Sequence, residues 1–313
     1  AEELGVEGAS TMRRQDLMFC ILRELAEDEE YEEKIMGIPE KTELVVLPEM
    51  FSTGFSMKPE VLAEEMNGPT VQWMQQTAAR KKIILTGSVI IKEGDAYYNR
   101  LIWMLPNGQW GHYDKRHRFA FAGEDEHYTA GSQRFIASVN GFKINLLVCY
   151  DLRFPVWARQ QPAAGADFEY DILLYVANWP QRRSHAWKTL LQARAIENQS
   201  YVIGVNRVGN DGNNIYHSGD SMVVDALGEV LYHKQDDEDV FTITLKKEDL
   251  QTVREKFPFW RDRDWDYRTV RQYEATAEIV TGRGPKPDTN VRAFDAREVL
   301  DRLGPSIRMP EVR

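Results

Sequence analysis

The fold class of this 313-residue chain is decided by residues 142–157, FKINLLVCYDLRFPVW. The apolar run in the first half is typical of a buried strand, and it stops at Cys149, where a polar turn begins. In open α/β folds, ligands bind beyond the carboxyl ends of the strands. Cys149 therefore stands where a nucleophile can act, although the same pattern also suits a cysteine buried as a small apolar side chain.

Similar stretches on both sides of this strand indicate a layered α/β protein. Seven more segments are rich in β-branched and aromatic residues and are bounded by Gly, Asn or Pro, which predicts strands over residues 44–48, 83–91, 97–105, 171–177, 201–207, 221–226 and 240–245. Helical periodicity predicts helices over residues 24–36, 69–81, 184–199 and 246–254. Ser184 is expected to cap the third of these helices. Strands interleaved with helices are typical of the α/β class.

The composition argues against nucleic acid and membranes as partners. With 39 Lys and Arg against 49 Asp and Glu, the net charge is −10, whereas nucleic-acid binding needs a basic face. No apolar run approaches the roughly 18 residues that a membrane span needs. The two cysteines, Cys20 and Cys149, cannot build a disulfide framework, and we see no export signal. We therefore expect free thiols and a cytoplasmic protein.

Two further reactive side chains stand out, and the first of them follows a predicted strand. Glu49 follows the apolar run LVVLP, where a carboxylate is suited to act as a general base. Lys115 lies in YDKRH, and its ammonium could stabilise a thiolate and hold an oxyanion. Each of the two, taken alone, also suits a solvated turn or a surface position. Together with Cys149 they supply a base, a cation and a nucleophile, the set needed to cleave an amide through a thioester.

These residues lie in motifs through which the chain resembles the nitrilase superfamily of carbon–nitrogen hydrolases. The resemblance runs from about residue 42 to about residue 260 and rests on LPEMFSTGF (47–55), YDKRHRF (113–119), GEDEHYTAG (123–131), VCYDLRFPVW (148–157), YVANWPQRRSHAW (175–187) and ARAIENQSYVIGVNRVGNDGN (193–213). Within the family, the chain looks most similar to the ω-amidase branch typified by bacterial 2-oxoglutaramate amidases.

The resemblance implies a four-layer αββα sandwich. We expect an N-terminal tail over residues 1–15, a nitrilase-like domain over residues 16–262 and a C-terminal extension over residues 263–313. Such domains pair helix to helix, which implies a homodimer or a larger homo-oligomer. The family usually opens with a strand and a loop. Residues 16–22 could form that strand, but they run almost directly into the predicted helix over residues 24–36, so the loop is shortened here.

The resemblance also implies roles for the reactive side chains. Cys149 corresponds to the nucleophile, Glu49 to the general base and acid, and Lys115 to the cation. The oxyanion is expected between the Lys115 ammonium and the backbone N–H of Tyr150. Neither a metal nor an organic cofactor is implied.

Two assignments have alternatives within the sequence. The second glutamate of the family corresponds to Glu124, and the neighbouring Asp125 or Glu126 could take that place instead. A Cys149–His pair, as in thiol proteases, is a different reading of the nucleophile. The six histidines that could supply it form no metal-binding spacing: His112, His117, His127, His185, His217 and His233.

The implied reaction is hydrolysis of a small ω-amide of a 2-oxo dicarboxylic acid, 2-oxoglutaramate or 2-oxosuccinamate, to the dicarboxylate and ammonia. The distal carboxylate of such a substrate needs a cation, and the fork of an arginine suits it. We expect Arg183 in this role, with Trp179 as a pocket wall and Arg153 as a second candidate, unless Arg153 pairs with Asp151 or another acid. The alternatives are a carbamoylase, a nitrilase, another small-amide amidase, or a non-catalytic scaffold that keeps the fold.

Overall fold

The computed structural model of the protein describes residues 42–162 and 166–262. The chain divides into two units, Ala1–Trp260 and Arg261–Arg313, and all but the last two described residues belong to the first. The tail, the predicted strand over residues 16–22, the helix over residues 24–36 and the C-terminal extension lie outside the described residues. The expected domain limits therefore stay predictions.

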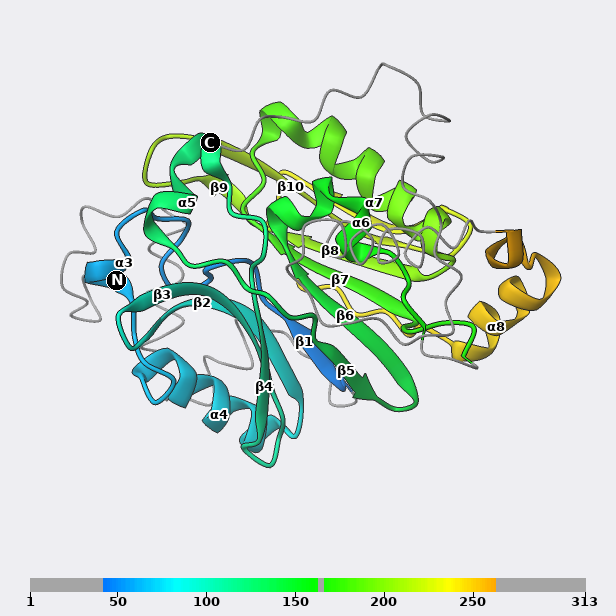
Figure 1. Ribbon diagram of the computed structural model, residues 1–313, viewed down its shortest axis with the longest axis horizontal. Helices are drawn as coiled ribbons and strands as arrows, with labels where there is room; N and C mark the ends of the chain where they lie inside the picture. Colours follow the sequence, from blue (N-terminus) through cyan, green and yellow to red (C-terminus); the bar gives the residue numbers. More distant parts are fainter. Residues whose placement is uncertain (1–41, 163–165, 263–313) are drawn as a thin grey trace, which may run out of the picture. The chain divides into compact units, whose positions relative to one another are not determined.

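The described chain contains runs of strands separated by helices (Figure 1). The strands are β1 (Leu44–Val46), β2 (Ile84–Glu93), β3 (Ala96–Met104), β4 (Trp110–Asp114), β5 (Ile136–Val139), β6 (Phe142–Val148), β7 (Ile172–Ala177), β8 (Tyr201–Asn206), β9 (Val208–Asn210), β10 (Tyr216–Val224) and β11 (Val230–Gln235). The α-helices are α3 (Pro59–Leu62), α4 (Pro69–Lys81), α5 (Glu124–His127), α6 (Pro155–Ala158), α7 (Ser184–Asn198) and α8 (Lys247–Lys256). Short 3₁₀ helices are η3 (Ala120–Ala122), η4 (Cys149–Arg153), η5 (Gln181–Arg183) and η6 (Phe259–Asp262).

The strands form two sheets. The first sheet has the order β1-β2-β3-β4; β1 and β2 pair in parallel, and β3 pairs antiparallel with both β2 and β4. The second has the order β11-β10-β8-β7-β6-β5, with β9 paired to β10. At its centre β6, β7 and β8 run parallel, so their carboxyl ends meet at one edge. β6 ends at Val148, which places Cys149 at that edge.

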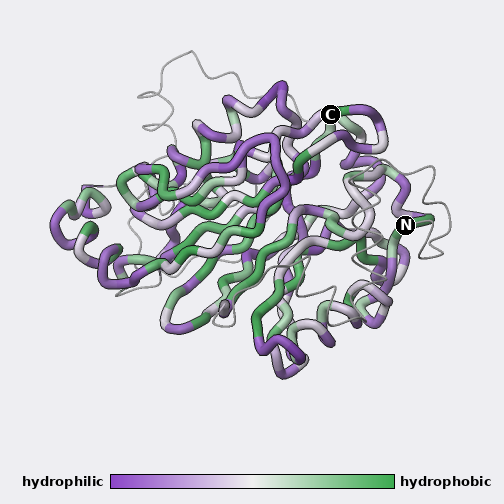
Figure 2. The backbone as a smooth tube through the Cα atoms, turned by 180° about the vertical axis from the view of Figure 1, so that it is seen from behind, coloured by the Kyte–Doolittle hydropathy of each residue, from purple (hydrophilic) through white to green (hydrophobic). Residues whose placement is uncertain are grey.

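The two sheets pack face to face, and helices cover their outer faces (Figure 1). α4 lies on the first sheet, and α7 lies on β8 and β10 of the second. The central strands are hydrophobic along their length, whereas hydrophilic residues gather on helices and loops (Figure 2). All residues of β7 are buried. This confirms the predicted αββα sandwich.

Local sequence explains where the two long helices begin and end. Pro69 starts α4, where the missing N–H of proline costs nothing. Lys82 and Gln199 end α4 and α7 in left-handed conformations, with φ of 57° and 44°. A Cβ at Gly204 of β8 would lie 2.6 Å from Leu191, so only glycine allows α7 to approach the sheet this closely.

Three details differ from the sequence predictions. Residues 240–245 do not form a strand: their alternation suits one, but no described strand pairs with them, and about half of the surface of Phe241 is exposed. β4, β5, β9 and β11 were not predicted, because they are short or rich in polar residues. Ser184 does not cap α7. It is the first residue of the helix, and its hydroxyl donates to Asp220 at 2.6 Å.

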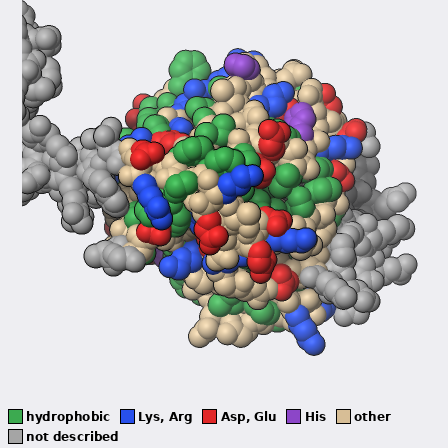
Figure 3. Space-filling model, turned by 90° about the vertical axis from the view of Figure 1, so that its right-hand side faces the viewer, with side chains coloured by type: hydrophobic (Ala, Val, Ile, Leu, Met, Phe, Trp, Pro, Cys, Tyr) green, Lys and Arg blue, Asp and Glu red, His purple; other side chains and the backbone are tan. Residues whose placement is uncertain are grey.

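A cavity of about 760 Å³ is lined by residues of both sheets and of the segment 237–245. None of the reactive side chains singled out in the sequence lines it. Acidic and basic side chains are interspersed on the face shown in Figure 3, so this face has no continuous basic stripe. No helix of the described residues combines the length and apolarity needed to cross a membrane.

Candidate active site

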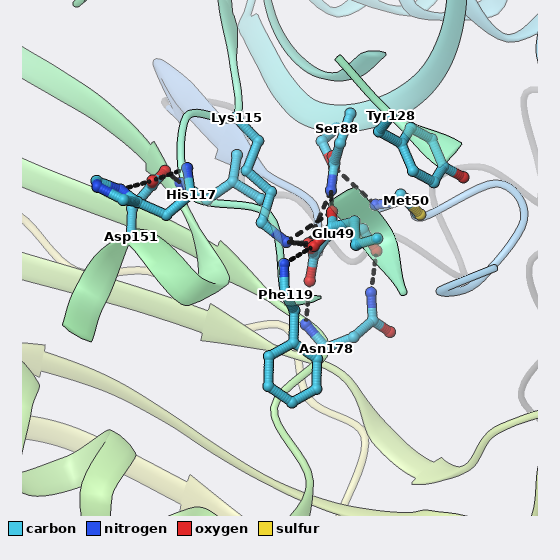
Figure 4. Close-up of polar contacts among 12 residues, drawn as sticks. Glu49, Met50, Ser88, Lys115, His117, Phe119, Tyr128, Asp151 and Asn178 are labelled. Atoms are coloured by element: carbon cyan, nitrogen blue, oxygen red, sulfur yellow. Dashed lines mark hydrogen bonds and ion pairs between the residues drawn. The ribbon is translucent and has the colours of Figure 1, made fainter. Parts of the chain in front are cut away.

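An ammonium held between two carboxylates forms the centre of the site (Figure 4). Lys115 Nζ lies 2.9 Å from Glu49 Oε1 and 2.9 and 2.8 Å from the two carboxylate oxygens of Glu124. All three side chains are at most 1 % exposed. Buried charges are stable only when paired and hydrogen-bonded, and both conditions are met here. Of the three adjacent acids in the chain, Glu124 is the one that pairs with Lys115, and Asp125 and Glu126 are exposed.

These three groups come from different parts of the chain. Glu49 follows β1, Lys115 follows β4, and Glu124 begins α5. The loop between Lys115 and Gly131 is closed by a hydrogen bond from the Gly131 N–H to the Lys115 carbonyl at 3.0 Å. A Cβ at Gly131 would lie 1.9 Å from the backbone oxygen of Asp114, so this contact requires glycine.

Cys149 lies in a strained turn at the carboxyl end of β6. Its φ of 43° is in the left-handed region, which a non-glycine residue rarely adopts. Such backbone strain, at about 1–3 kcal/mol, is found mainly at functional sites. The side chain is 8 % exposed. The turn therefore directs a nearly buried thiol away from the regular strand.

The charged groups act on the thiol. Burial raises the pKa of Cys149 well above its usual value, and the negative charge of Glu49 raises it further, while the Lys115 ammonium lowers it. The backbone N–H of Asn178 donates to Glu49 Oε2 at 2.7 Å, and it also lowers the pKa of the thiol. Asn178 therefore acts on both Glu49 and Cys149.

The two carboxylates keep Lys115 charged. Burial alone would lower the pKa of Lys115, but the charges of Glu124 and Glu49 outweigh it and raise the pKa above its ordinary value. Burial raises the pKa of Glu124, and Lys115 opposes that shift. The surroundings of Lys115 thus favour its charged form, which can stabilise negative charge.

Two asparagines that the sequence did not single out orient Glu49. Asn99 Nδ2 donates to Glu49 Oε1 at 2.8 Å and to Glu124 Oε1 at 3.3 Å. Asn178 Nδ2 donates to the Glu49 carbonyl at 2.6 Å (Figure 4). Asn178 directly follows β7, and this strand-end position was the only signal that could have pointed to it.

Arg183, Arg153 and Trp179 form a cationic rim beside the thiol. The Arg183 guanidinium is 5.2 Å from the centre of the Phe119 ring, and the Arg153 guanidinium is 4.8 Å from the centre of the Trp179 ring. Burial lowers the pKa of Arg183, and the like charges of Arg182 and Arg153 lower it too. No carboxylate of the described residues forms an ion pair with Arg153 or Arg183. The alternative Arg153–Asp151 pair is therefore not formed.

Within this rim, Trp179 is buried and hydrogen-bonded to the backbone of Arg183. It is 4 % exposed, and its indole N–H donates to the Arg183 carbonyl at 2.8 Å. Arg194 and Glu197 of α7 form an ion pair at 3.3 Å. The structure records no hydrogen bond between Cys149 and a described histidine, and the ring of His117 binds Asp151 at 2.7 Å instead. Within the described part of the chain, no group of three His, Cys, Asp or Glu side chains could hold a metal ion.

Comparison with known proteins decides the family. Residues 28–255 match the profile described as Carbon-nitrogen hydrolase, which is more than half of the chain. The chain belongs to the carbon–nitrogen hydrolase family. Its reaction class is therefore hydrolysis of carbon–nitrogen bonds other than peptide bonds. Residues 1–30 also match the N-terminal domain of Rho termination factor, and this segment lies outside the described residues.

Relatives of this carbon–nitrogen hydrolase include two curated enzymes. It is 43 % identical to "Omega-amidase YafV" of Yersinia enterocolitica over 72 % of this chain and 86 % of the relative. It is 33 % identical to "2-oxoglutaramate amidase" of Bacillus subtilis over 70 % of this chain and 84 % of the relative.

Two solved structures share the fold. XC1258 from Xanthomonas campestris, a CN-hydrolase superfamily protein with an arsenic adduct in its active site, has a TM-score of 0.72 and 42 % identity, covering 76 % of this chain and 91 % of that chain. Nit3 of Saccharomyces cerevisiae, from branch 10 of the nitrilase superfamily, has a TM-score of 0.65 and 25 % identity, covering 79 % and 90 %.

Proposed function

We propose that this carbon–nitrogen hydrolase is an ω-amidase that converts 2-oxoglutaramate or 2-oxosuccinamate to the dicarboxylate and ammonia. The observation that carries the proposal is the Lys115 ammonium held by Glu49 and Glu124 beside the strained thiol of Cys149. The relatives named ω-amidase and 2-oxoglutaramate amidase support this choice of substrate.

In the first half of the reaction, Cys149 is the nucleophile. Glu49 accepts the thiol proton, and the thiolate forms a bond to the amide carbonyl carbon, whose oxygen becomes negative. Lys115 and the backbone N–H of Tyr150 stabilise that oxyanion. Glu49 then donates the proton to the amide nitrogen, the carbon–nitrogen bond breaks, and ammonia leaves. The acyl group remains on sulfur as a thioester.

In the second half, water replaces the sulfur. Glu49 accepts a proton from a water molecule, whose oxygen attacks the thioester carbonyl. The carbon–sulfur bond breaks, the carboxylic acid leaves, and the proton returns to the Cys149 thiolate. Each proton moves within the same buried group of charges, so the net charge of the group is unchanged by the transfer from Cys149 to Glu49. This avoids placing an additional charge in a buried site.

Glu124 acts on Lys115 and not on the substrate. Both of its oxygens accept hydrogen bonds from Lys115 Nζ, and one accepts the Phe119 N–H at 2.5 Å. With the Asn99 hydrogen bond to Oε1 at 3.3 Å, each oxygen of Glu124 accepts two hydrogen bonds. Its role is to fix the position of the ammonium and to keep it charged.

The rim of Arg183, Arg153 and Trp179 selects the substrate. A guanidinium that stacks on an aromatic ring and has no carboxylate partner in the described residues is available to bind one. The distal carboxylate of a dicarboxylic monoamide would supply the missing negative charge. It would also offset the mutual repulsion that lowers the pKa of Arg183.

We also propose that the enzyme is a homodimer or a larger homo-oligomer in the cytoplasm. Val156 on α6 and Ile196 on α7 are apolar and more than half exposed, which supports pairing of this helical face with a second copy. The molar mass in solution, measured by light scattering, tests the assembly. A purely monomeric enzyme would contradict it.

Ammonia release tests the proposed activity. The wild-type enzyme is offered 2-oxoglutaramate, an uncharged short amide and a nitrile at equal concentrations, with Cys149→Ala as the control. We expect rapid ammonia release from 2-oxoglutaramate and none from the variant. Faster turnover of the uncharged amide or of the nitrile would move the enzyme to another branch of the family. No turnover of any substrate by folded wild type would favour a non-catalytic scaffold.

A further inference from the structure

A buried carboxylate outside the reacting groups binds three parts of the site together. Asp151 follows Cys149 by two residues and is fully buried. Its Oδ2 accepts the backbone N–H of Val148 at 3.0 Å and the hydroxyl of Tyr113 at 2.8 Å. Its Oδ1 accepts two hydrogen bonds from His117, from the backbone N–H at 3.0 Å and from ring Nδ1 at 2.7 Å (Figure 4).

The donors flank the nucleophile and the cation. Val148 immediately precedes Cys149, while Tyr113 and His117 lie two residues before and two residues after Lys115. A single carboxylate therefore connects the turn that carries the sulfur with the segment that carries the ammonium. Buried networks in which every bond is made are rigid, so these bonds hold the two segments at a fixed separation.

The bond to Val148 also supports the strain at the nucleophile. Cys149 has a φ of 43°, and a strained backbone persists only where its surroundings hold it in place. The hydrogen bond from the Val148 N–H to Asp151 Oδ2 closes the turn across Cys149. If this bond were lost, the turn could relax and carry the sulfur away from Lys115.

The partners of Asp151 are themselves held in place. The His117 ring stacks on Phe154 at 4.0 Å between centres, with an angle of 12° between the planes. The Trp157 indole N–H donates to the Tyr113 oxygen at 3.0 Å. Burial and the charge of Asp151 raise the pKa of Tyr113 well above its usual value, so the phenol stays protonated and remains a donor.

We propose that Asp151 and His117 are positioning residues that set the separation between the Cys149 thiol and the Lys115 ammonium. Neither is assigned contact with the substrate. The proposal rests on the proposed function only for its choice of substrate. It predicts that loss of the His117 ring donor impairs formation of the thioester, with little effect on substrate binding.

Two substitutions of the same residue separate hydrogen bonding from packing. His117→Asn keeps an N–H donor near the position of Nδ1 but loses the ring, whereas His117→Phe keeps a ring against Phe154 but loses the donor. The His117 side chain is 23 % exposed, so both variants are expected to fold. Asp171→Asn is the matched control, because Asp171 is also a buried carboxylate with backbone and cationic partners, at the opposite end of β7.

Two quantities are measured for each variant. The first is kcat and KM for ammonia release from 2-oxoglutaramate. The second is the rate at which iodoacetamide alkylates Cys149 as a function of pH, followed by mass spectrometry of the peptide that contains Cys149. The alkylation reports on the thiolate alone and needs no substrate. Thermal unfolding of each variant monitors folding.

For His117→Phe we expect kcat to fall by about 10- to 100-fold with KM near the wild-type value. The pH at half-maximal alkylation rises, because Lys115 no longer lies close enough to favour the thiolate. His117→Asn recovers most of both losses, and Asp171→Asn lowers the unfolding temperature without affecting kcat or the alkylation profile. Equal behaviour of the two His117 variants would overturn the proposal, as would an unchanged alkylation profile in His117→Phe. If wild type does not hydrolyse 2-oxoglutaramate, a shifted alkylation profile still supports the positioning role and only the proposed function fails.

Discussion

Replacing Lys115 with methionine removes one charge from the centre of the site while nearly keeping the shape of the side chain. The ammonium makes three contacts of 2.8 to 2.9 Å with Glu49 and Glu124. As a donor to the developing oxyanion, it is worth about 3–4 kcal/mol, so kcat is expected to fall by roughly 10²- to 10³-fold. The assay is steady-state ammonia release from 2-oxoglutaramate.

The same substitution also affects folding, because it leaves two buried carboxylates without their cation. Breaking a buried pair in this way costs about 3–5 kcal/mol of unfolding free energy. Burial already raises the pKa of Glu124 in wild type, and Lys115 opposes that shift. Without the cation, we expect one carboxyl group to have a pKa further above its unfolded value, so that the folded state takes up a proton at a higher pH than the unfolded state does. The destabilisation is therefore larger at pH 7 than at pH 5, because protonation of this carboxyl group at the lower pH favours the folded variant.

Urea unfolding at pH 7 and pH 5, followed by tryptophan fluorescence, measures this difference. The control is Lys188→Met. Lys188 pairs with the buried Asp220 at 3.1 Å, but its side chain is 35 % exposed and Asp220 has other donors, so we expect a loss of at most about 1 kcal/mol and unchanged kcat. A folded Lys115→Met enzyme that keeps more than about a tenth of wild-type kcat would refute the oxyanion role. Equal stability of this variant and wild type at pH 7 would refute the charge argument.

Three further predictions follow from the same contacts. Glu49→Gln removes the general base and is expected to lower kcat by about 10²- to 10⁴-fold in the ammonia assay. A change in KM with kcat unchanged would contradict that role. Arg183→Gln is expected to raise KM for 2-oxoglutaramate by about 10- to 100-fold, with no change for an uncharged amide; equal changes for both substrates would exclude carboxylate recognition. Burial, together with the charge of Arg207, lowers the pKa of His217 to about 4. The unfolding free energy of wild type should therefore fall by up to about 3 kcal/mol as the pH falls from 6.5 to 4, because the unfolded state takes up the proton first. The unfolding free energy of His217→Gln, measured by urea titration, should depend less on pH than that of wild type. Parallel curves of unfolding free energy against pH for the two proteins would contradict this account.

Strand ends were the most informative feature of the sequence. Cys149 and Glu49 both follow long apolar runs that form β6 and β1, so their placement at the sheet edge could be predicted from local pattern. Lys115 follows β4, whose sequence WGHYD is too short and polar to be recognised as a strand. Its position was found through its motif, and its pairing with both glutamates could not be predicted from local pattern.

Contacts between distant segments lay beyond sequence reasoning. Asn178 donates a hydrogen bond to Glu49, which is 129 positions away in the chain. An asparagine that follows a strand does not by itself indicate such a partner. Asp151 was considered only as a partner for Arg153, yet its hydrogen bonds go to Tyr113 and to His117, 38 and 34 positions away. Side-chain direction depends on the turn at η4, and that left-handed turn is not encoded by a glycine.

The covalent intermediate is the most direct test of the account. Wild-type enzyme is mixed with excess 2-oxoglutaramate, quenched in acid within the first turnover, digested and analysed by mass spectrometry. We predict a mass increase of one 2-oxoglutaryl group on the peptide that contains Cys149, and no such increase on the peptide that contains Cys20. Ammonia release without any acyl group on Cys149, or with the acyl group on another residue, would contradict the claim that this thiol carries the reaction.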